Sequence, residues 1–167
     1  MVDNQTTMNP NALMHGTDYA GQQVDGWLAA EKLDGWRAYW DGSRLWTRQG
    51  KPYAAPRWFL AALPSFPLDC ELVARESTSA SKVQSLVQSG DWGNLVLRPL
   101  LAPDGRDISA LPGAVQWTPV CDLNSAVHRM QEVQMRGGEG LMLRRPGSGY
   151  TPGRVKTLLK LKNFLPQ

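Results

Sequence analysis

A turn signal near position 41 constrains the fold of this chain more than any other local feature. Asp41 and Gly42 separate two runs that are rich in aromatic and aliphatic residues, at positions 27–41 and 44–48. Asp-Gly between such runs is typical of a two-residue hairpin turn, because both residues tolerate the left-handed backbone that the turn requires. The first third of the chain is therefore expected to contain an antiparallel β-hairpin.

The remaining pattern mixes strands with one clear helix. Residues 125–136 have an apolar stripe at helical spacing, with Asn124 as the expected N-cap and Gly137 as the stop. Residues 56–63 are expected to form a short helix, and residues 77–90 are polar and either helical or mobile. Further strands are expected at residues 66–74, 94–101, 140–145 and 156–164.

This order of elements favours a mixed α+β domain of mainly antiparallel sheets flanked by helices. The 16 Gly and 12 Pro fit many short elements joined by turns better than a helical bundle. A length of 167 residues suits one domain. We expect a polar N-terminal leader over residues 1–24 and one folded domain over residues 25–167, with no second-domain boundary.

Two observations bear on the cellular compartment. The N-terminal stretch has no apolar run, so neither a signal peptide nor a transmembrane span is expected. Cys70 and Cys121 are far apart and outside any CxxC pattern, which argues against a disulfide framework and a zinc site. We therefore expect a cytoplasmic protein without a membrane partner.

Positive charge is concentrated in the last fifth of the chain, although the formal net charge of the whole chain is only +3. Scattered charge is usually a solvated face, but this density would also suit contact with polyphosphate or nucleic acid. Glu139 is the acidic residue of the segment, and its basic residues are Arg136, Arg144, Arg145, Arg154, Lys156, Lys160 and Lys162.

Residues 31–37, which read Glu-Lys-Leu-Asp-Gly-Trp-Arg, carry the strongest chemical signal. A lone lysine on a strand is usually a solvated surface charge, but Lys32 has apolar neighbours and is followed by Asp-Gly and an arginine. An amine attacks phosphorus only when it is deprotonated, and an ordinary lysine has a pKa near 10.4. Desolvation and neighbouring cations lower a lysine pKa, so such a setting suits a nucleophile.

The pattern Lys-x-Asp-Gly-x-Arg resembles the active-site signature of the covalent nucleotidyltransferases, which include ATP-dependent DNA ligases, RNA ligases and mRNA capping enzymes. Three later segments resemble other motifs of this family, in the family's order. They are Leu-Asp-Cys-Glu-Leu at residues 68–72, Glu-Gly-Leu-Met-Leu-Arg at 139–144 and Leu-Lys-Leu-Lys at 159–162. The wording of residues 31–42, 45–50 and 136–143 is most similar to small bacterial DNA ligases of the Lig E type.

The resemblance implies a nucleotidyltransferase domain of ATP-grasp-like architecture, the adenylylation domain of an ATP-dependent DNA ligase. Lys32 would attack the α-phosphorus of ATP, expel pyrophosphate and hold AMP, which then passes to the 5′-phosphate of a DNA nick before sealing. ATP and Mg²⁺ are the implied cofactors, and nicked double-stranded DNA is the implied partner. An RNA ligase or capping-type enzyme stays open as an alternative, as does a catalytically impaired nucleotide- or DNA-binding remnant.

The resemblance also implies residue roles at the nucleotide. Glu31 would lie beside the adenine, and Arg37 would bind the ribose or the terminal phosphates. Arg48 would meet the AMP phosphate or the 5′-phosphate of the nick, for which a planar guanidinium fork is well suited. Lys160 and Lys162 would offset the charge that develops on the α-phosphate.

Carboxylates and surface cations complete the implied site. Glu71 would bind the ribose hydroxyl, and Glu71 and Glu139 would both serve Mg²⁺, which prefers hard oxygen ligands. Weak contacts with DNA are expected from Arg144, Arg145, Arg154 and Lys156.

Three departures from the family pattern carry expectations of their own. Cys70 stands where the family has Gly, which would put a side chain where backbone should approach closely. In residues 94–103, Leu100 or Leu101 takes the place of the aromatic residue that stacks on adenine, which would weaken base stacking. The family's OB-fold domain, which clamps the nick, is absent from these 167 residues, so a separate chain is the expected source of that clamp.

Overall fold

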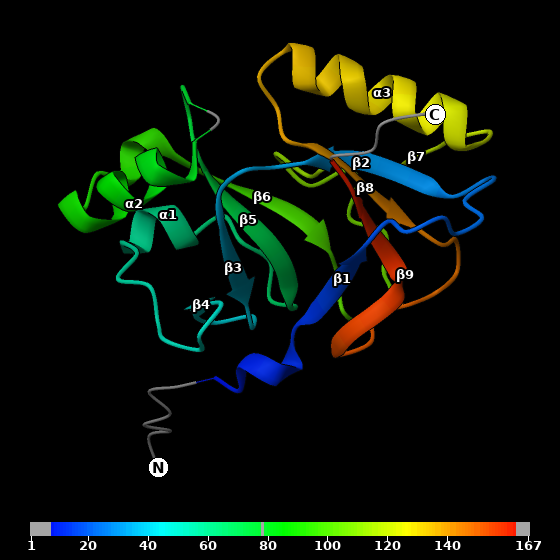
Figure 1. Ribbon diagram of the computed structural model, residues 1–167. Helices are drawn as coiled ribbons and strands as arrows, with labels where there is room; N and C mark the ends of the chain where they lie inside the picture. The colour runs from blue at the N-terminus through cyan, green and yellow to red at the C-terminus, as the bar shows by residue number, and fades with distance from the viewer. Residues whose placement is uncertain (1–7, 78, 163–167) are drawn as a thin grey trace.

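The computed structural model describes residues 8–77 and 79–162, and within them the strands form two sheets (Figure 1). The five-stranded sheet contains, in spatial order, β1 (Met14–Asp18), β9 (Gly153–Leu161), β8 (Gly140–Arg144), β2 (Leu28–Lys32) and β7 (Thr118–Pro119). The four-stranded sheet contains β4 (Leu45–Thr47), β3 (Trp36–Trp40), β5 (Leu68–Ala74) and β6 (Leu95–Leu101). Neighbouring strands are antiparallel except β1 and β9, which run parallel. The predicted α+β class with mainly antiparallel sheets is confirmed.

Each sheet has its own helices and its own core. Helix α3 (Leu123–Met135) covers the five-stranded sheet, while α1 (Arg57–Leu60) and α2 (Ala80–Ser89) lie beside the four-stranded one (Figure 1). Two 3₁₀ turns, η1 (Pro10–Ala12) and η2 (Trp92–Asn94), complete the described elements. No helix in the described part of the chain is long and apolar enough to cross a membrane.

The hairpin predicted at Asp41-Gly42 is present between β3 and β4. Asp41 Oδ1 accepts hydrogen bonds from the backbone N–H groups of Ser43 and Arg44, and Gly42 has a φ of 101°. The preceding run, however, is not one strand. It divides at residues 33–35 into β2 and β3, which belong to different sheets. Local patterning could not indicate this division, because both halves have strand-like composition.

The predicted leader over residues 1–24 is wrong for its second half. Strand β1 is part of the five-stranded sheet, paired with β9, and Leu13, Met14 and Val24 are buried. The signal was missed because these apolar residues are isolated in a polar stretch and the partner strand lies more than a hundred residues away. Residues 1–7 lie outside the described part of the chain.

Helix α3 starts two residues earlier than predicted, with Asp122 as its N-cap in place of Asn124. The Asp122 carboxylate accepts a hydrogen bond from the Ser125 N–H, and the Ser125 hydroxyl oxygen accepts one from the Asp122 N–H, which together form a capping box. The predicted stop holds, since Gly137 follows the helix with a φ of 86°. Strand β9 begins at Gly153, earlier than predicted, and residues 163–164 of the predicted strand lie outside the described residues.

Candidate functional site

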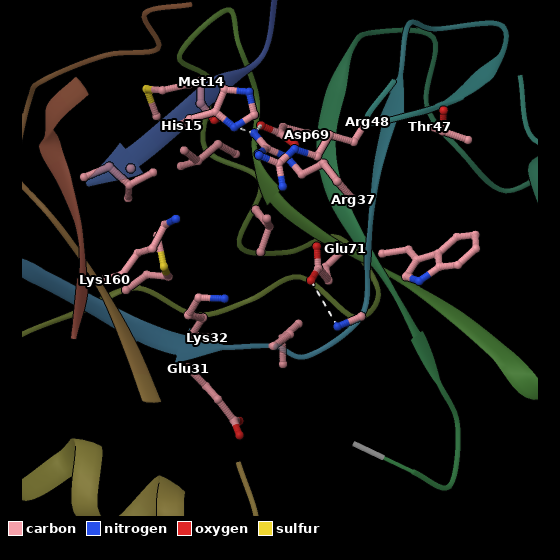
Figure 2. A pocket seen from close by; sticks show the side chains of 18 of the residues that line it. Met14, His15, Glu31, Lys32, Arg37, Thr47, Arg48, Asp69, Glu71 and Lys160 are labelled. Atoms are coloured by element: carbon pink, nitrogen blue, oxygen red, sulfur yellow. Dashed lines mark hydrogen bonds and ion pairs between the residues drawn. The ribbon is translucent and has the colours of Figure 1, made fainter. Parts of the chain in front are cut away.

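A cavity of about 570 Å³ lies between the two sheets, and residues of both sheets line it. Six of the predicted site residues share it (Figure 2). They are Glu31, Lys32, Arg37, Arg48, Glu71 and Lys160. The predicted signature segment and the later motifs, far apart in sequence, are therefore brought to one place by the fold.

The signature segment crosses from one sheet to the other, and the contacts of Asp34 and Gly35 explain why these two residue types stand there. Lys32 ends β2, and β3 begins four residues later. Asp34 accepts a hydrogen bond from the Ala80 N–H at 3.3 Å, so its negative charge lies at the N-terminus of α2, where the helix dipole favours it. A Cβ atom at Gly35 would collide with the Leu72 carbonyl oxygen of β5. Only glycine allows the crossing segment to pass this close to the second sheet.

Strand register brings a carboxylate to Lys32. Lys32 pairs with Gly140 in the β2–β8 ladder, so Glu139 lies next to the end of β2. The Lys32 Nζ atom is 3.2 Å from Glu139 Oε2, and Lys162 Nζ is 3.5 Å from Glu139 Oε1. A Cβ atom at Gly140 would lie 2.5 Å from the Leu161 carbonyl oxygen, which explains the glycine that follows this glutamate. One carboxylate thus connects two lysines.

Arg37 and Asp69 form a buried ion pair on the opposite wall. Asp69 accepts from Arg37 Nε at 2.6 Å, from Arg37 Nη2, and from the Tyr150 hydroxyl at 2.7 Å. The backbone of Met14 takes part too: its carbonyl accepts from Arg37, and its N–H donates to Tyr150. Burial opposes the charge on Arg37, but the contact with Asp69 outweighs it and raises the arginine pKa. This network connects the four-stranded sheet to β1 of the other sheet.

Alternation along β5 decides which residues face the cavity. Asp69 and Glu71 line it, while Cys70 packs in the core of the four-stranded sheet. The expected intrusion of the Cys70 side chain is therefore wrong, since the pleat turns it away from the cavity. Burial raises the pKa of Glu71 to about 7. Weaker effects oppose this rise, and they include the hydrogen bond that the Gly35 N–H donates to Glu71 Oε2 at 3.2 Å and the positive charge of Lys32 nearby.

The cations of the cavity lie close enough to affect each other. Burial lowers the pKa of Lys160, and the charges of Lys32, Lys162 and Arg154 lower it further. His15, which sequence analysis did not select, also lines the cavity, and burial together with nearby arginines lowers its pKa. Such a positive site favours an anionic ligand such as a phosphate group.

Some predicted residues lie outside this cavity, and the side chain of Glu31, which lines it, points away from Lys32, toward α3 (Figure 2). Glu139 lies on a second cavity of about 780 Å³, which also has Lys32 in its wall. Arg144 is half-buried, with its guanidinium 5.3 Å from the centre of the Trp117 ring. The remaining predicted DNA contacts are exposed and lie outside the cavity between the sheets; they are Arg145, Arg154 and Lys156.

Sequence analysis also missed Asp69, Tyr150, Trp117 and Met142. Asp69 could have been found, because it stands two residues before Glu71 on the same face of a strand. Met142 likewise lies on a segment that had been selected. Tyr150 and Trp117 had no local signal, because each is an isolated aromatic residue outside the described strands.

The sequence of the chain is similar to that of a curated protein. No protein-family model matches the chain. A curated DNA ligase from Haemophilus influenzae is 31% identical over 163 residues, which cover 86% of this chain and 60% of the relative. The chain thus spans less than two thirds of that ligase.

Solved structures show the same architecture. A structure from a study of DNA binding by Lig E DNA ligases superposes with a TM-score of 0.76 at 25% identity, covering 91% of this chain and 68% of the other. The Chlorella virus DNA ligase-adenylate superposes with a TM-score of 0.74 at 18% identity, covering 90% and 66%. The second likeness concerns the fold alone.

Proposed function

We propose that this chain is the adenylylation core of an ATP-dependent DNA ligase, because it resembles ligases in sequence and in fold. It transfers AMP from ATP to its own Lys32 and then to the 5′-phosphate of a DNA nick, which allows sealing. The observation that carries the proposal is the place of Lys32. Its amine reaches a cavity that also contains Lys160 and the Arg37–Asp69 pair, and its Nζ atom has Glu139 as a partner at 3.2 Å.

The first step follows from this geometry. The Lys32 Nζ atom forms a bond to the α-phosphorus of ATP while the bond to pyrophosphate breaks. The ammonium must lose a proton first, and Glu139 Oε2 is within reach of that proton. Lys160 and Lys162 stabilise the negative charge that develops on the α-phosphate. Arg37 and Glu71 lie on the opposite wall, where they meet the ribose.

In this proposal, Mg²⁺ is assigned to Glu71 and Glu139, which line two different cavities. In the described residues no three acidic or metal-ligating side chains cluster together. Mg²⁺ does not need such a cluster, because it keeps several waters and binds one or two carboxylates plus substrate phosphates. Glu71 and Glu139 would each supply an oxygen to it. The ion would neutralise charge on the phosphates of ATP.

Exposed arginines and lysines near the cavity give the DNA surface of this proposal. Arg48 is exposed at the cavity itself and suits the 5′-phosphate of the nick. Arg145 follows β8, Arg154 and Lys156 lie on β9, and all three side chains are exposed. Nicked double-stranded DNA is the proposed partner, in the cytoplasm. Single alanine variants of these residues should each reduce the salt dependence of DNA binding.

The alternatives are less well supported. The relatives above are DNA ligases, which does not favour an RNA ligase or a capping enzyme. The catalytically impaired remnant rested partly on Cys70, whose side chain faces the core. The ion pairs of Lys32 with Glu139 and of Arg37 with Asp69 favour an active enzyme over a remnant.

The test is covalent labelling of the protein. Wild-type protein with labelled ATP and Mg²⁺ should form an acid-labile AMP adduct on Lys32, and labelled GTP should not. Lys32→Ala and Lys32→Arg should abolish the adduct, since a guanidinium stays protonated and does not attack. Lys82→Ala, at an exposed lysine on α2, is the matched control and should label normally. An adduct on either Lys32 variant would contradict the proposal.

A further inference from the structure

One wall of the cavity is apolar, and the phosphate chemistry proposed above does not use it. Its side chains form a cluster separate from the two larger cores. Its aromatic members are Trp117, which lines the cavity, and Tyr150, which is not among the lining residues. The other cavity aromatics, Trp36 and Tyr53, pack against the core of the four-stranded sheet. The cavity-lining members of this apolar wall are Met14, Leu100, Leu101, Trp117, Met142 and Leu158.

Strand register places the apolar wall at a fixed distance from the nucleophile. Lys32 pairs with Gly140, and Ala30 pairs with Met142, two residues further along β8. Two residues of a strand span about 7 Å. A nucleotide whose α-phosphorus meets Lys32 therefore has its base within reach of the apolar wall, because only the ribose separates the base from that phosphate.

Trp117 is held in place by contacts with both sheets. It precedes β7, which pairs with β2 of the five-stranded sheet, and its indole Nε1 donates to the Leu100 carbonyl oxygen of β6 at 2.9 Å. The Arg144 guanidinium lies over the ring, and Arg144 Nε is buried without a hydrogen-bond partner among the described residues. The hydrogen bond from Nε1 thus holds the edge of the indole, and Arg144 lies over one of its faces. The Trp117 side chain is nevertheless only partly buried.

We propose that Trp117 contacts the purine base of the bound nucleotide, and that Leu100, Leu101 and Met142 complete the base site. An aromatic ring binds a base by stacking, and its removal weakens binding by about 5- to 150-fold. The aromatic contact then comes from the segment before β7, and the two leucines of β6 supply apolar packing around it. This inference rests on the proposed function.

The test separates contact with the base from contact with the rest of the nucleotide. Binding of AMP and of ribose 5-phosphate, which lacks the base, is measured by calorimetry. Trp117→Leu keeps an apolar side chain and removes the ring, while Trp117→Phe keeps an aromatic ring. Trp58→Leu is the matched control, since Trp58 on α1 is 63% exposed and far from the cavity lining. Thermal melts establish that each variant is folded.

Trp117→Leu should weaken AMP binding by about 5-fold or more and leave ribose 5-phosphate unchanged, and Trp117→Phe should retain most of the AMP affinity. Equal losses for both ligands would assign Trp117 a general structural role and overturn the inference, as would no loss for either. The proposed function fails by a different result: wild-type protein that binds AMP through its base but never acquires covalent AMP from ATP.

Discussion

The two sheets that flank the cavity hold their charges in different ways. On the five-stranded sheet, Lys32 and Lys162 share one carboxylate at 3.2 and 3.5 Å, and the three side chains are 22%, 36% and 28% exposed. On the four-stranded sheet, the Asp69 side chain is 3% exposed and accepts three hydrogen bonds, from Arg37 and Tyr150. The lysines and the carboxylate of the five-stranded sheet are loosely paired and partly exposed to solvent. Asp69 on the four-stranded sheet is buried and hydrogen-bonded to both Arg37 and Tyr150.

The difference follows from what each wall has to do in the proposed reaction. Lys32 must release Glu139, attack phosphorus and later release AMP, so a weak, partly solvated partner is adequate. Arg37 must stay where it is while the nucleotide changes. A buried charge with all its partners is costly to disturb. In this proposal the partly exposed Lys32–Glu139 pair takes part in the reaction, and the buried Arg37–Asp69 pair keeps its position.

The largest expected effect comes from breaking the buried pair. Asp69→Ala leaves the Arg37 charge buried without its main partner, and removing one member of such a pair typically costs about 3–5 kcal/mol. Chemical denaturation should show this loss in the free energy of unfolding. Asp104→Ala is the matched control, because Asp104 pairs with Arg106 on the exposed surface and should change stability little. Equal effects from the two variants would remove the contrast between a buried and an exposed pair.

The loosely paired carboxylate should respond in rate before it responds in stability. Glu139→Gln should slow covalent adenylylation by about 10²-fold, the usual scale for losing a group that positions transition-state charge, and Glu71→Gln on the buried wall should slow it by a similar factor. Glu139→Gln should leave the thermal midpoint almost unchanged, since its ion pairs are partly solvated. Single-turnover labelling and thermal melts measure the two properties. Glu132→Gln, at an exposed site on α3, is the control. If Glu139→Gln slows adenylylation no more than Glu132→Gln does, Glu139 has only a surface role.

The buried wall should also give stability a pH dependence. Burial raises the pKa of Glu71 from its ordinary 4.5 to about 7, so the folded protein holds this proton more tightly than the unfolded chain does. Stability should therefore fall as pH rises from about 4.5 to about 7, and this contribution should be flat above that range. Denaturation at a series of pH values measures it. Glu71→Gln should lose the slope, and an unchanged slope in that variant would assign the titration to another group.

Local signals were sufficient for several features. The hairpin at Asp41-Gly42, the stop of α3 at Gly137 and the two strands that carry Glu71 and Lys160 follow from turn chemistry and periodicity. The signature around Lys32 and three later motifs were enough to predict an adenylylation domain, and six of the predicted residues do share one cavity. Each of these signals lies within a few neighbouring residues.

The tertiary structure decided the rest, because it depends on register between distant segments. The crossing at Gly35 requires the Leu72 backbone, β1 requires β9, and the Glu139 contact with Lys32 requires the β2–β8 ladder. Tyr150 and Trp117 acquire their places only when both sheets are assembled. The sequence by itself therefore predicted the nucleophile and determined the motifs around it. Which partners hold the buried arginine, and which aromatic residues line the cavity, follow from packing that no local pattern encodes.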